Sequence, residues 1–316
     1  MGAARGQCAR ERAGEPPVIV EAGNLWKRYG RFEALRGLAF GIPEGSAFAL
    51  VGPNGAGKTT TIKVLLNLLT ASRGSARVLG VDSRTLSPRE LADVGYVSEN
   101  QELPGRLTVS QYLAYLRPFY PRWDRALEGS MLQEMQLPPA RRIGDLSHGM
   151  RIKMALVCAL AGRPRLLVLD EPFAGLDPLV RDEVIAGLLR QAGELTILIS
   201  SHELTEIEGV ATDVGFLHDG QLLFQEPMGR LADRCREVYV TLDSMARIPD
   251  PLPPHWLQPR AVGNVLTFVD TQFSDDSLGG LVRLLFDGVR NIDAKPMNLR
   301  SIFTTLAPAA RDGALP

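Results

Sequence analysis

One segment constrains the fold of this chain more than any other. It is Gly52–Thr59, which has the pattern G-x-x-x-x-G-K-T and lies between the apolar run Phe48–Val51 and the helix-like Thr60–Leu69. A strand, a glycine-rich turn and a helix in this order predict a phosphate-binding loop, in which backbone N–H groups and the helix N-terminus face phosphate oxygens. We expect Lys58 to reach the β- and γ-phosphates and the Thr59 hydroxyl to bind Mg²⁺. The alternative is a turn that merely closes a strand–helix junction.

A second motif places two carboxylates at the end of an apolar strand. Leu166–Leu169 is followed by Asp170 and Glu171. Because uncompensated burial of charge is costly, these acids need a partner, and Mg²⁺ is a suitable one. Asp170 is expected to hold the metal, through water, and Glu171 to orient or deprotonate an attacking water. The alternative is an acid pair that caps the next helix.

A third motif lies between the first two, at the start of the helical run Ile152–Ala161. Here Ser147 can serve as a helix N-cap, and Gly149 keeps the first-turn amides open. This arrangement predicts a second anion-binding helix end in the same chain. Ordinary capping is the competing interpretation.

Composition narrows the class of protein. The chain has 316 residues, with 35 Lys+Arg against 36 Asp+Glu and a formal net charge of −1. The length predicts roughly two domains, and the near-neutral charge weighs against nucleic acid as a partner. No apolar stretch approaches the roughly 18 residues needed to cross a bilayer, and the N-terminus lacks the apolar region of a secretory signal. The widely spaced Cys8, Cys158 and Cys235 favour a reducing cytoplasm over a disulfide framework or zinc site.

Short apolar runs that alternate with helical patterns predict an α/β fold with a buried parallel sheet. The predicted strands are Ala47–Val51, Leu166–Leu169, Thr196–Ser200 and Val214–Leu217. Residues 103–145 carry few strand signals and predict a helical insertion.

The character of the sequence changes after Pro227. Two predicted strands, Glu237–Asp243 and Ala261–Asp270, are followed by a helix at 278–285 and another around Leu299–Leu306. We therefore expect a disordered tail at 1–17, a main domain at 18–226 with a helical subdomain at about 100–160, a small α+β domain at 227–307, and a tail at 308–316.

Taken together and in this order, the motifs resemble the nucleotide-binding subunit of an ATP-binding cassette (ABC) transporter. The phosphate loop, the Leu-Ser-x-Gly signature, the Asp-Glu-Pro strand end, Gly175–Asp177 and Ser201-His202 carry the resemblance, over about residues 18–226. The stretch Tyr120–Asp124 and the C-terminal extension are similar to ATPases of ABC-2-type exporters. The resemblance implies a P-loop cassette with a mostly parallel core sheet, an antiparallel β portion and a helical insertion.

The resemblance also implies roles for individual residues. Tyr29 matches the aromatic residue that stacks on adenine, although a strand-end core aromatic is the alternative. His202 matches the switch histidine that contacts the γ-phosphate and helps to hold water and Glu171 in line. Asp177 lies in a loop expected to contact an opposite subunit, or it forms a turn before Pro178. The expected nucleotide-binding residues are Tyr29, Gly52, Pro53, Asn54, Gly55, Ala56, Gly57, Lys58, Thr59, Thr60, Ser147 and Gly149, and the expected catalytic residues are Glu171, His202 and Lys58.

Two departures from the family pattern stand out. Where the family often has Gln near Mg²⁺ and water, Glu99 aligns best, with Gln101 as a nearby alternative, so the expected metal ligands are Thr59, Asp170 and Glu99. The signature has His148 and Met150 where Gly and Gln are commonest, while Ser147 and Gly149 are intact.

The resemblance implies ATP and Mg²⁺ as cofactors, and a homo- or heterodimer with each ATP held between two subunits. It further implies a separate membrane permease that drives export, contacted near Leu103–Phe119, and a place on the cytoplasmic face of the membrane. The alternatives are a non-transport ABC ATPase that acts on nucleic acid or ribosomes, and a binding module that does not hydrolyse ATP because His148 and Glu99 have spoiled turnover.

Overall fold

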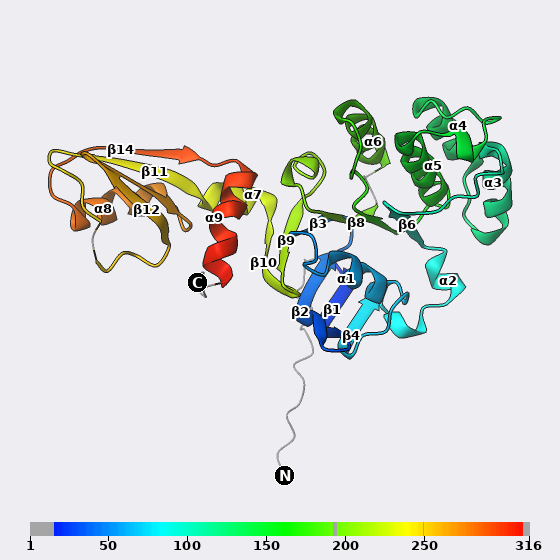
Figure 1. The fold of residues 1–316 in the computed structure, drawn as a ribbon, viewed down its shortest axis with the longest axis horizontal. Coiled ribbons are helices and arrows are strands. Elements are labelled where there is room, and N and C mark those ends of the chain that lie inside the picture. The colour runs from blue at the N-terminus through cyan, green and yellow to red at the C-terminus, as the bar shows by residue number, and fades with distance from the viewer. Residues whose placement is uncertain (1–15, 192–194, 249, 312–316) are drawn as a thin grey trace, which may run out of the picture.

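The fold is built from three sheets that follow one another along the chain (Figure 1). The computed structural model describes residues 16–191, 195–248 and 250–311. The predicted tail at 1–17, with Cys8, lies almost entirely outside this range, as does the chain from residue 312 onward. None of the helices in the described ranges is long and apolar enough to cross a membrane.

The first sheet is antiparallel and has the strand order β2-β1-β4-β5. Its strands are β1 (Val18–Tyr29), β2 (Phe32–Pro43), β4 (Arg73–Val78) and β5 (Val81–Asp82). The central sheet has the order β10-β9-β3-β8-β7-β6, in which only β10 runs antiparallel to its neighbour. Its strands are β3 (Ala47–Val51), β6 (Val94–Ser98), β7 (Leu166–Asp170), β8 (Thr196–Ser201), β9 (Asp213–His218) and β10 (Gln221–Pro227). The predicted α/β class is confirmed.

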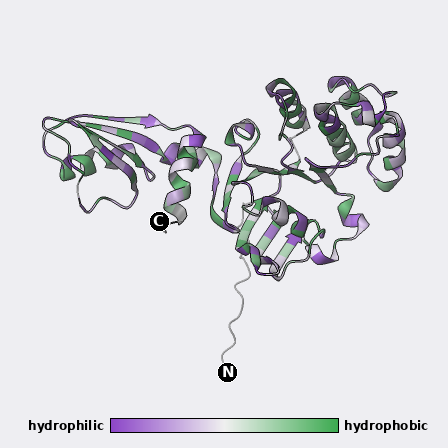
Figure 2. Cartoon of the chain, viewed as in Figure 1, coloured by the Kyte–Doolittle hydropathy of each residue, from purple (hydrophilic) through white to green (hydrophobic). Residues whose placement is uncertain are grey.

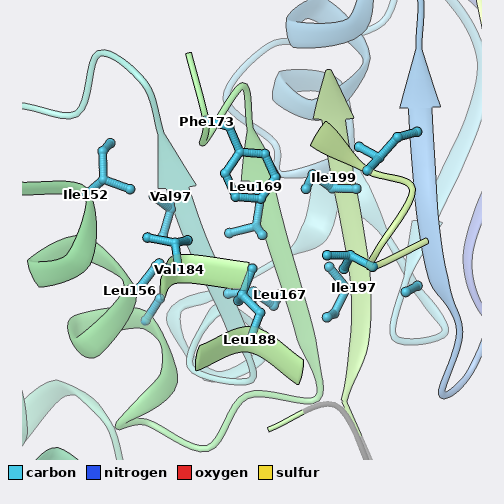
Figure 3. Packing of buried hydrophobic residues seen from close by; sticks show 14 of the residues in the cluster. Val97, Ile152, Leu156, Leu167, Leu169, Phe173, Val184, Leu188, Ile197 and Ile199 are labelled. Carbon is cyan, nitrogen blue, oxygen red and sulfur yellow. The ribbon is translucent and has the colours of Figure 1, made fainter. Parts of the chain in front are cut away.

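The central strands β3, β7 and β8 are buried along their whole length because both faces of the sheet are covered. In β7, Leu167 and Leu169 pack into one core cluster with α5 and α6, whereas Leu166 and Val168 pack into the other with α1 and the first sheet. Figure 3 shows the first of these faces. The covering helices are α1 (Lys58–Leu65), α5 (His148–Leu160) and α6 (Pro178–Gln191). Apolar residues accordingly gather on α5 and the central strands (Figure 2).

The helical insertion lies at the β6 end of the central sheet (Figure 1). It contains α3 (Val109–Leu116) and α4 (Arg125–Glu134), with short 3₁₀ turns η2 (Arg117–Phe119) and η3 (Ile143–Asp145). Thr108 begins α3 with a capping box, in which its hydroxyl accepts from the Gln111 amide and its own amide donates to the Gln111 side chain. The connection from β5 to β6 carries η1 (Ser83–Thr85) and α2 (Pro88–Leu91), and η4 (Leu204–Glu206) follows β8.

The third sheet is antiparallel, with the order β12-β13-β11-β14. Its strands are β11 (Arg236–Leu242), β12 (Trp256–Val262), β13 (Val265–Asp270) and β14 (Val289–Pro296), and α8 (Asp275–Leu285) packs on it. The prediction of one strand over Ala261–Asp270 was wrong. Gly263 has a φ of 60° and starts a turn that divides the stretch into β12 and β13.

The last helix returns to the cassette. After α7 (Met228–Arg234) and the third sheet, α9 (Leu299–Arg311) lies between that sheet and β10 (Figure 1). The ring of Phe303 is 5.2 Å from that of Phe216 in β9 and 5.5 Å from that of Phe224 in β10, measured between centroids. The helix runs through Pro308 to Arg311, so the predicted boundary between domain and tail at 307 falls inside it. The interpretation of 308–311 as tail was wrong because the proline does not end the helix.

We predict that Phe303→Ala destabilises the protein by about 3–5 kcal/mol, because the ring is buried and its removal leaves a cavity beside Phe216 and Phe224. Urea-induced unfolding measures the change. Phe119→Ala is the matched control, since its ring is 60% exposed and its loss is expected to cost about 0.5 kcal/mol or less. Equal effects of the two substitutions would contradict a packing role for α9.

Candidate functional site: a phosphate loop facing two carboxylates

The phosphate loop connects the buried strand β3 to α1. Gly57 is the N-cap residue of α1, with a left-handed φ of 109°, and no side chain caps the helix. The first-turn amides of α1 are therefore left for another acceptor. Such an end, with its partial positive charge, favours a phosphate group.

Two glycines in this loop are required by space, and one of them, Gly57, also by its backbone angle. A Cβ at Gly52 would lie 2.0 Å from the carbonyl oxygen of Leu217, and one at Gly57 would lie 2.7 Å from that of Ala34. Any side chain at either position would push the loop away from the strands beside it. The glycines thus fix how closely the loop folds against β2 and β9.

Lys58, the first residue of α1, is 5% exposed and is bound on several sides. Its Nζ donates to the carbonyl oxygens of Gly52 at 2.6 Å and Pro53 at 3.2 Å. It also lies 3.0 Å from Oε1 of Glu171. The ammonium is therefore held directly over the loop, with its charge balanced by a carboxylate from β7's carboxyl end.

Glu171 is held in an unusual backbone conformation. Its φ is 52°, in the left-handed region that non-glycine residues seldom adopt. Its amide donates to Ser200 Oγ at 3.0 Å. Strain of this kind is found where the surrounding structure holds a functional group in place.

His202 completes a chain of charged contacts across the site. Its Nδ1 lies 2.8 Å from Oε2 of Glu171, so the nitrogen that faces the carboxylate carries a proton. The hydrogen bond to Glu171 raises the pKa of His202 above its ordinary value of 6.5, and this outweighs partial burial, which lowers it. Lys58, Glu171 and His202 thus form one connected row.

Asp170 and Thr59 bring oxygen atoms together beside this row. The Thr59 hydroxyl donates to Oδ1 of Asp170 at 3.0 Å, and Ser200 Oγ donates to the same oxygen at 2.7 Å. Hydroxyl and carboxylate oxygens are the ligands that Mg²⁺ prefers. The residues present therefore fit that ion. Glu99 lies next to this group, since its amide donates to the Asp170 carbonyl at 3.0 Å.

A cavity of about 340 Å³ extends from Lys58, Thr59 and Glu171 to the predicted aromatic residue, whereas Asp170 and His202 do not line it. Tyr29 lies at its rim with its ring 45% exposed, and the ammonium of Lys27 is 5.0 Å from the ring centroid. The lining residues are Tyr29, Phe32, Ala34, Asn54, Gly55, Gly57, Lys58, Thr59, Thr60, Glu99 and Glu171. Gly52, Pro53 and Ala56 shape the loop from behind and do not line the cavity.

The signature residues lie elsewhere. Ser147 caps α5 by accepting from the Met150 amide at 3.3 Å, and Gly149 packs against Val180 of α6. Neither residue lines the cavity in the described part of the chain. Gln101 lines a separate groove of about 510 Å³, with Glu99 at its edge. Within one chain the structure therefore unites every predicted site residue near the phosphate loop except those of the signature.

Three residues of the site were not predicted, and one of them, Ala34, lines the cavity next to Phe32. Ser200 holds Asp170 and the Glu171 amide, and Phe32 lines the cavity beside Tyr29. Ser200 precedes Ser201-His202 in the sequence, but its contact with Asp170 depends on the pairing of β7 with β8. Phe32 could have been noticed as an apolar residue just after the turn that follows Tyr29.

Comparison with known proteins decides the family. The model of the family described as "ABC transporter" matches residues 35–174. The lantibiotic transport ATP-binding protein SrtF of Streptococcus pyogenes is 32% identical over 66% of this chain and 90% of its own length. The chain belongs to the ABC transporter ATP-binding family. This confirms the resemblance that the motifs predicted.

Other relatives agree with this ABC assignment. The probable multidrug ABC transporter ATP-binding protein YbhF of Escherichia coli is 32% identical over 65% of this chain, and the chain spans only 36% of the length of YbhF. A solved structure described as the ATP-binding subunit of an ABC transporter has a TM-score of 0.62 and 27% identity, and covers 68% of this chain and 92% of its own. The part of this chain that these two relatives match, 65% and 68% of its length, is about the size of one ATP-binding domain.

We predict a pH-dependent contribution of His202 to the stability of this ABC subunit without nucleotide or metal. Because the folded-state pKa is raised, the contribution is present below the unfolded value of 6.5 and is lost as the pH rises through the folded value. The difference in unfolding free energy between wild type and His202→Gln should therefore shrink between about pH 6 and about pH 9. Denaturant titrations at both pH values measure it.

The same comparison in a Glu171→Gln background is the control. The pH-dependent difference should be largely lost there, because the hydrogen bond to Glu171 is its main cause. A difference that is equally large at both pH values in the wild-type background would contradict the pairing.

Proposed function

We propose that this chain binds Mg²⁺-ATP and hydrolyses it as a dimer, and that closure of the dimer on ATP drives export through a separate membrane permease. The observation that carries the proposal is the connected row in which Glu171 lies 3.0 Å from Lys58 and 2.8 Å from His202, beside an open phosphate loop. Phosphoryl transfer to water needs this combination of cation, base and positioned proton donor. The names of the relatives, which include transport proteins, support the same function.

The cavity would set the orientation of a bound nucleotide. Adenine would stack on the exposed ring of Tyr29, and the phosphates would lie on the first-turn amides of α1. Thr59, Asp170 and Glu99 would hold Mg²⁺, which when bound neutralises charge on the transferring phosphoryl group. Ser200 keeps Asp170 turned towards Thr59.

The contacts of Lys58 suggest how the base is released. Without nucleotide the ammonium pairs with Glu171 and with carbonyl oxygens of its own loop. The β- and γ-phosphates would compete for that ammonium, since they offer more negative charge. Glu171 would then be free to accept a proton from water, while His202, still bonded to its other oxygen, holds the carboxylate in position.

Two subunits would be required because the signature residues Ser147 and Gly149 do not line the cavity of their own chain. Ser147 and Gly149 open α5, a 13-residue helix whose N-terminus favours an anion. A second copy, or a related cassette, would bring such a helix end over the γ-phosphate. Hydrolysis would remove the shared anion and so favour opening.

The permease would dock on the helical insertion. Tyr115 and Phe119 are each 60% exposed, and their rings lie 5.5 Å apart. They form an apolar surface patch, as is common at protein contacts. The chain would then lie on the cytoplasmic face of the membrane, and the permease would select the transported substrate.

We predict that Glu171→Gln lowers ATP hydrolysis by about 100-fold or more, because the general base is lost, while ATP is still bound. Size-exclusion chromatography with Mg²⁺-ATP should show an accumulated dimer, since the closed state cannot turn over. Glu208→Gln, an exposed carboxylate further along the same segment, is the control and should hydrolyse ATP at the wild-type rate. Full activity in Glu171→Gln would refute the role given to this carboxylate.

We also predict that Tyr115→Ala/Phe119→Ala loses the permease but keeps ATP hydrolysis. Affinity isolation from solubilised membranes, followed by identification of the co-purifying chain, measures the first effect, and ATP turnover of the purified subunit measures the second. Leu284→Ala, an exposed apolar residue of α8, is the control and should retain the partner. Undiminished recovery of a membrane protein with the double variant would place the docking surface elsewhere.

A further inference from the structure

The signature helix is joined to the loop that leaves β7. We call Ala174–Asp177 the exit loop; it connects the strand end at Glu171 to α6. His148, the first residue of α5, has its Nε2 3.2 Å from the carbonyl oxygen of Ala174. A carbonyl can only accept, so Nε2 donates and carries a proton. The side chain between Ser147 and Gly149 is thus turned towards its own chain.

Further contacts continue this junction along the two helices. A Cβ at Gly149 would lie 2.8 Å from the side chain of Val180, so α5 and α6 are closely packed there. Lys153, on the next turn of α5, forms an ion pair with Glu183 of α6. The packing of the helices is therefore fixed below the loop. At the exposed end, one side-chain hydrogen bond joins α5 to the exit loop among the described residues, and it is the bond from His148 to Ala174.

The exit loop depends on this bond because its own hydrogen bonds are local. The amide of Leu176 donates to the Phe173 carbonyl at 3.1 Å, and that of Val180 donates to Oδ1 of Asp177 at 3.0 Å. Gly175, with a φ of 70°, adds conformational freedom. Leu176 packs against the core close to Gly149, and the His148 ring adds the side-chain hydrogen bond that ties the loop to α5.

We propose that His148 is a positioning residue that fixes the exit loop to the signature helix, so that both approach the second subunit as one rigid unit. The inference rests on the proposed ATP-dependent dimer. The ring of His148 also lines the groove of about 510 Å³ formed by residues 98–105 and α5. His148 thereby connects the groove to the exit loop by a directional hydrogen bond, beside the apolar contact of Leu176.

The test uses three substitutions at His148 in the full chain. In Gln the amide nitrogen occupies nearly the place of Nε2 and can donate to Ala174, whereas the shorter Asn amide cannot reach it and Ala has no donor. Hydrogen exchange of the amides of residues 174–180, without nucleotide, reports the loop directly. The ATP concentration for half-maximal hydrolysis reports closure. His255→Ala, in the C-terminal domain, is the control.

We expect H148A and H148N to speed exchange in the loop by about 2- to 10-fold and to raise the half-maximal ATP concentration by a similar factor, which is the worth of one hydrogen bond. H148Q should restore both values. Unchanged exchange in H148A, or a failure of H148Q to differ from H148N, would overturn the proposal. If the wild-type chain does not hydrolyse ATP, the proposed function fails, while the exchange measurement still decides the role of His148.

Discussion

The structure of the site depends on the balance of charge around one buried ammonium. Lys58 is almost fully buried, and burial of an isolated charge is among the costliest events in folding. Glu171 and two carbonyl oxygens compensate it, and His202 in turn holds the far oxygen of Glu171. The strained φ of Glu171 is tolerated because contacts on both sides secure the carboxylate. A phosphate that enters the loop would pair with the Lys58 ammonium in place of Glu171. Phosphate binding would therefore release the Glu171 carboxylate to act as a base.

Local chemistry explains why much of the site was predictable. The loop requires glycines at positions where a Cβ would meet a carbonyl oxygen, so the sequence pattern reports the geometry directly. The acids at the end of β7 and the capping serine of α5 are likewise visible as short patterns in the chain. Strands such as β7 and β8 carry continuous apolar runs, Leu166–Leu169 and Ile197–Ile199, because both of their faces are buried, and this marks them in the sequence.

What could not be predicted depends on contacts between distant segments. The role of Ser200 follows from its register opposite Asp170 across β7 and β8, which no local pattern encodes. The single strand expected at 261–270 is divided by a turn at Gly263, which adopts a left-handed angle. The end of α9 was misplaced because residues 308–316 were expected to form a tail, whereas the helix continues through Pro308 to Arg311, and Phe303 and Leu306 pack in the core.

The return of α9 to the cassette bears on how the chain folds during synthesis. Phe303 follows Phe216 by 303 − 216 = 87 residues, yet their rings are in contact in the finished core. At translation rates of about 5–20 residues per second, Phe216 and Phe224 wait roughly 4–17 seconds for their partner. During that interval the edge of the central sheet carries uncovered aromatic surface. Helix α9 thus completes a domain whose phosphate loop was synthesised some 250 residues earlier, and the central sheet reaches its final packing only after Phe303 has been synthesised.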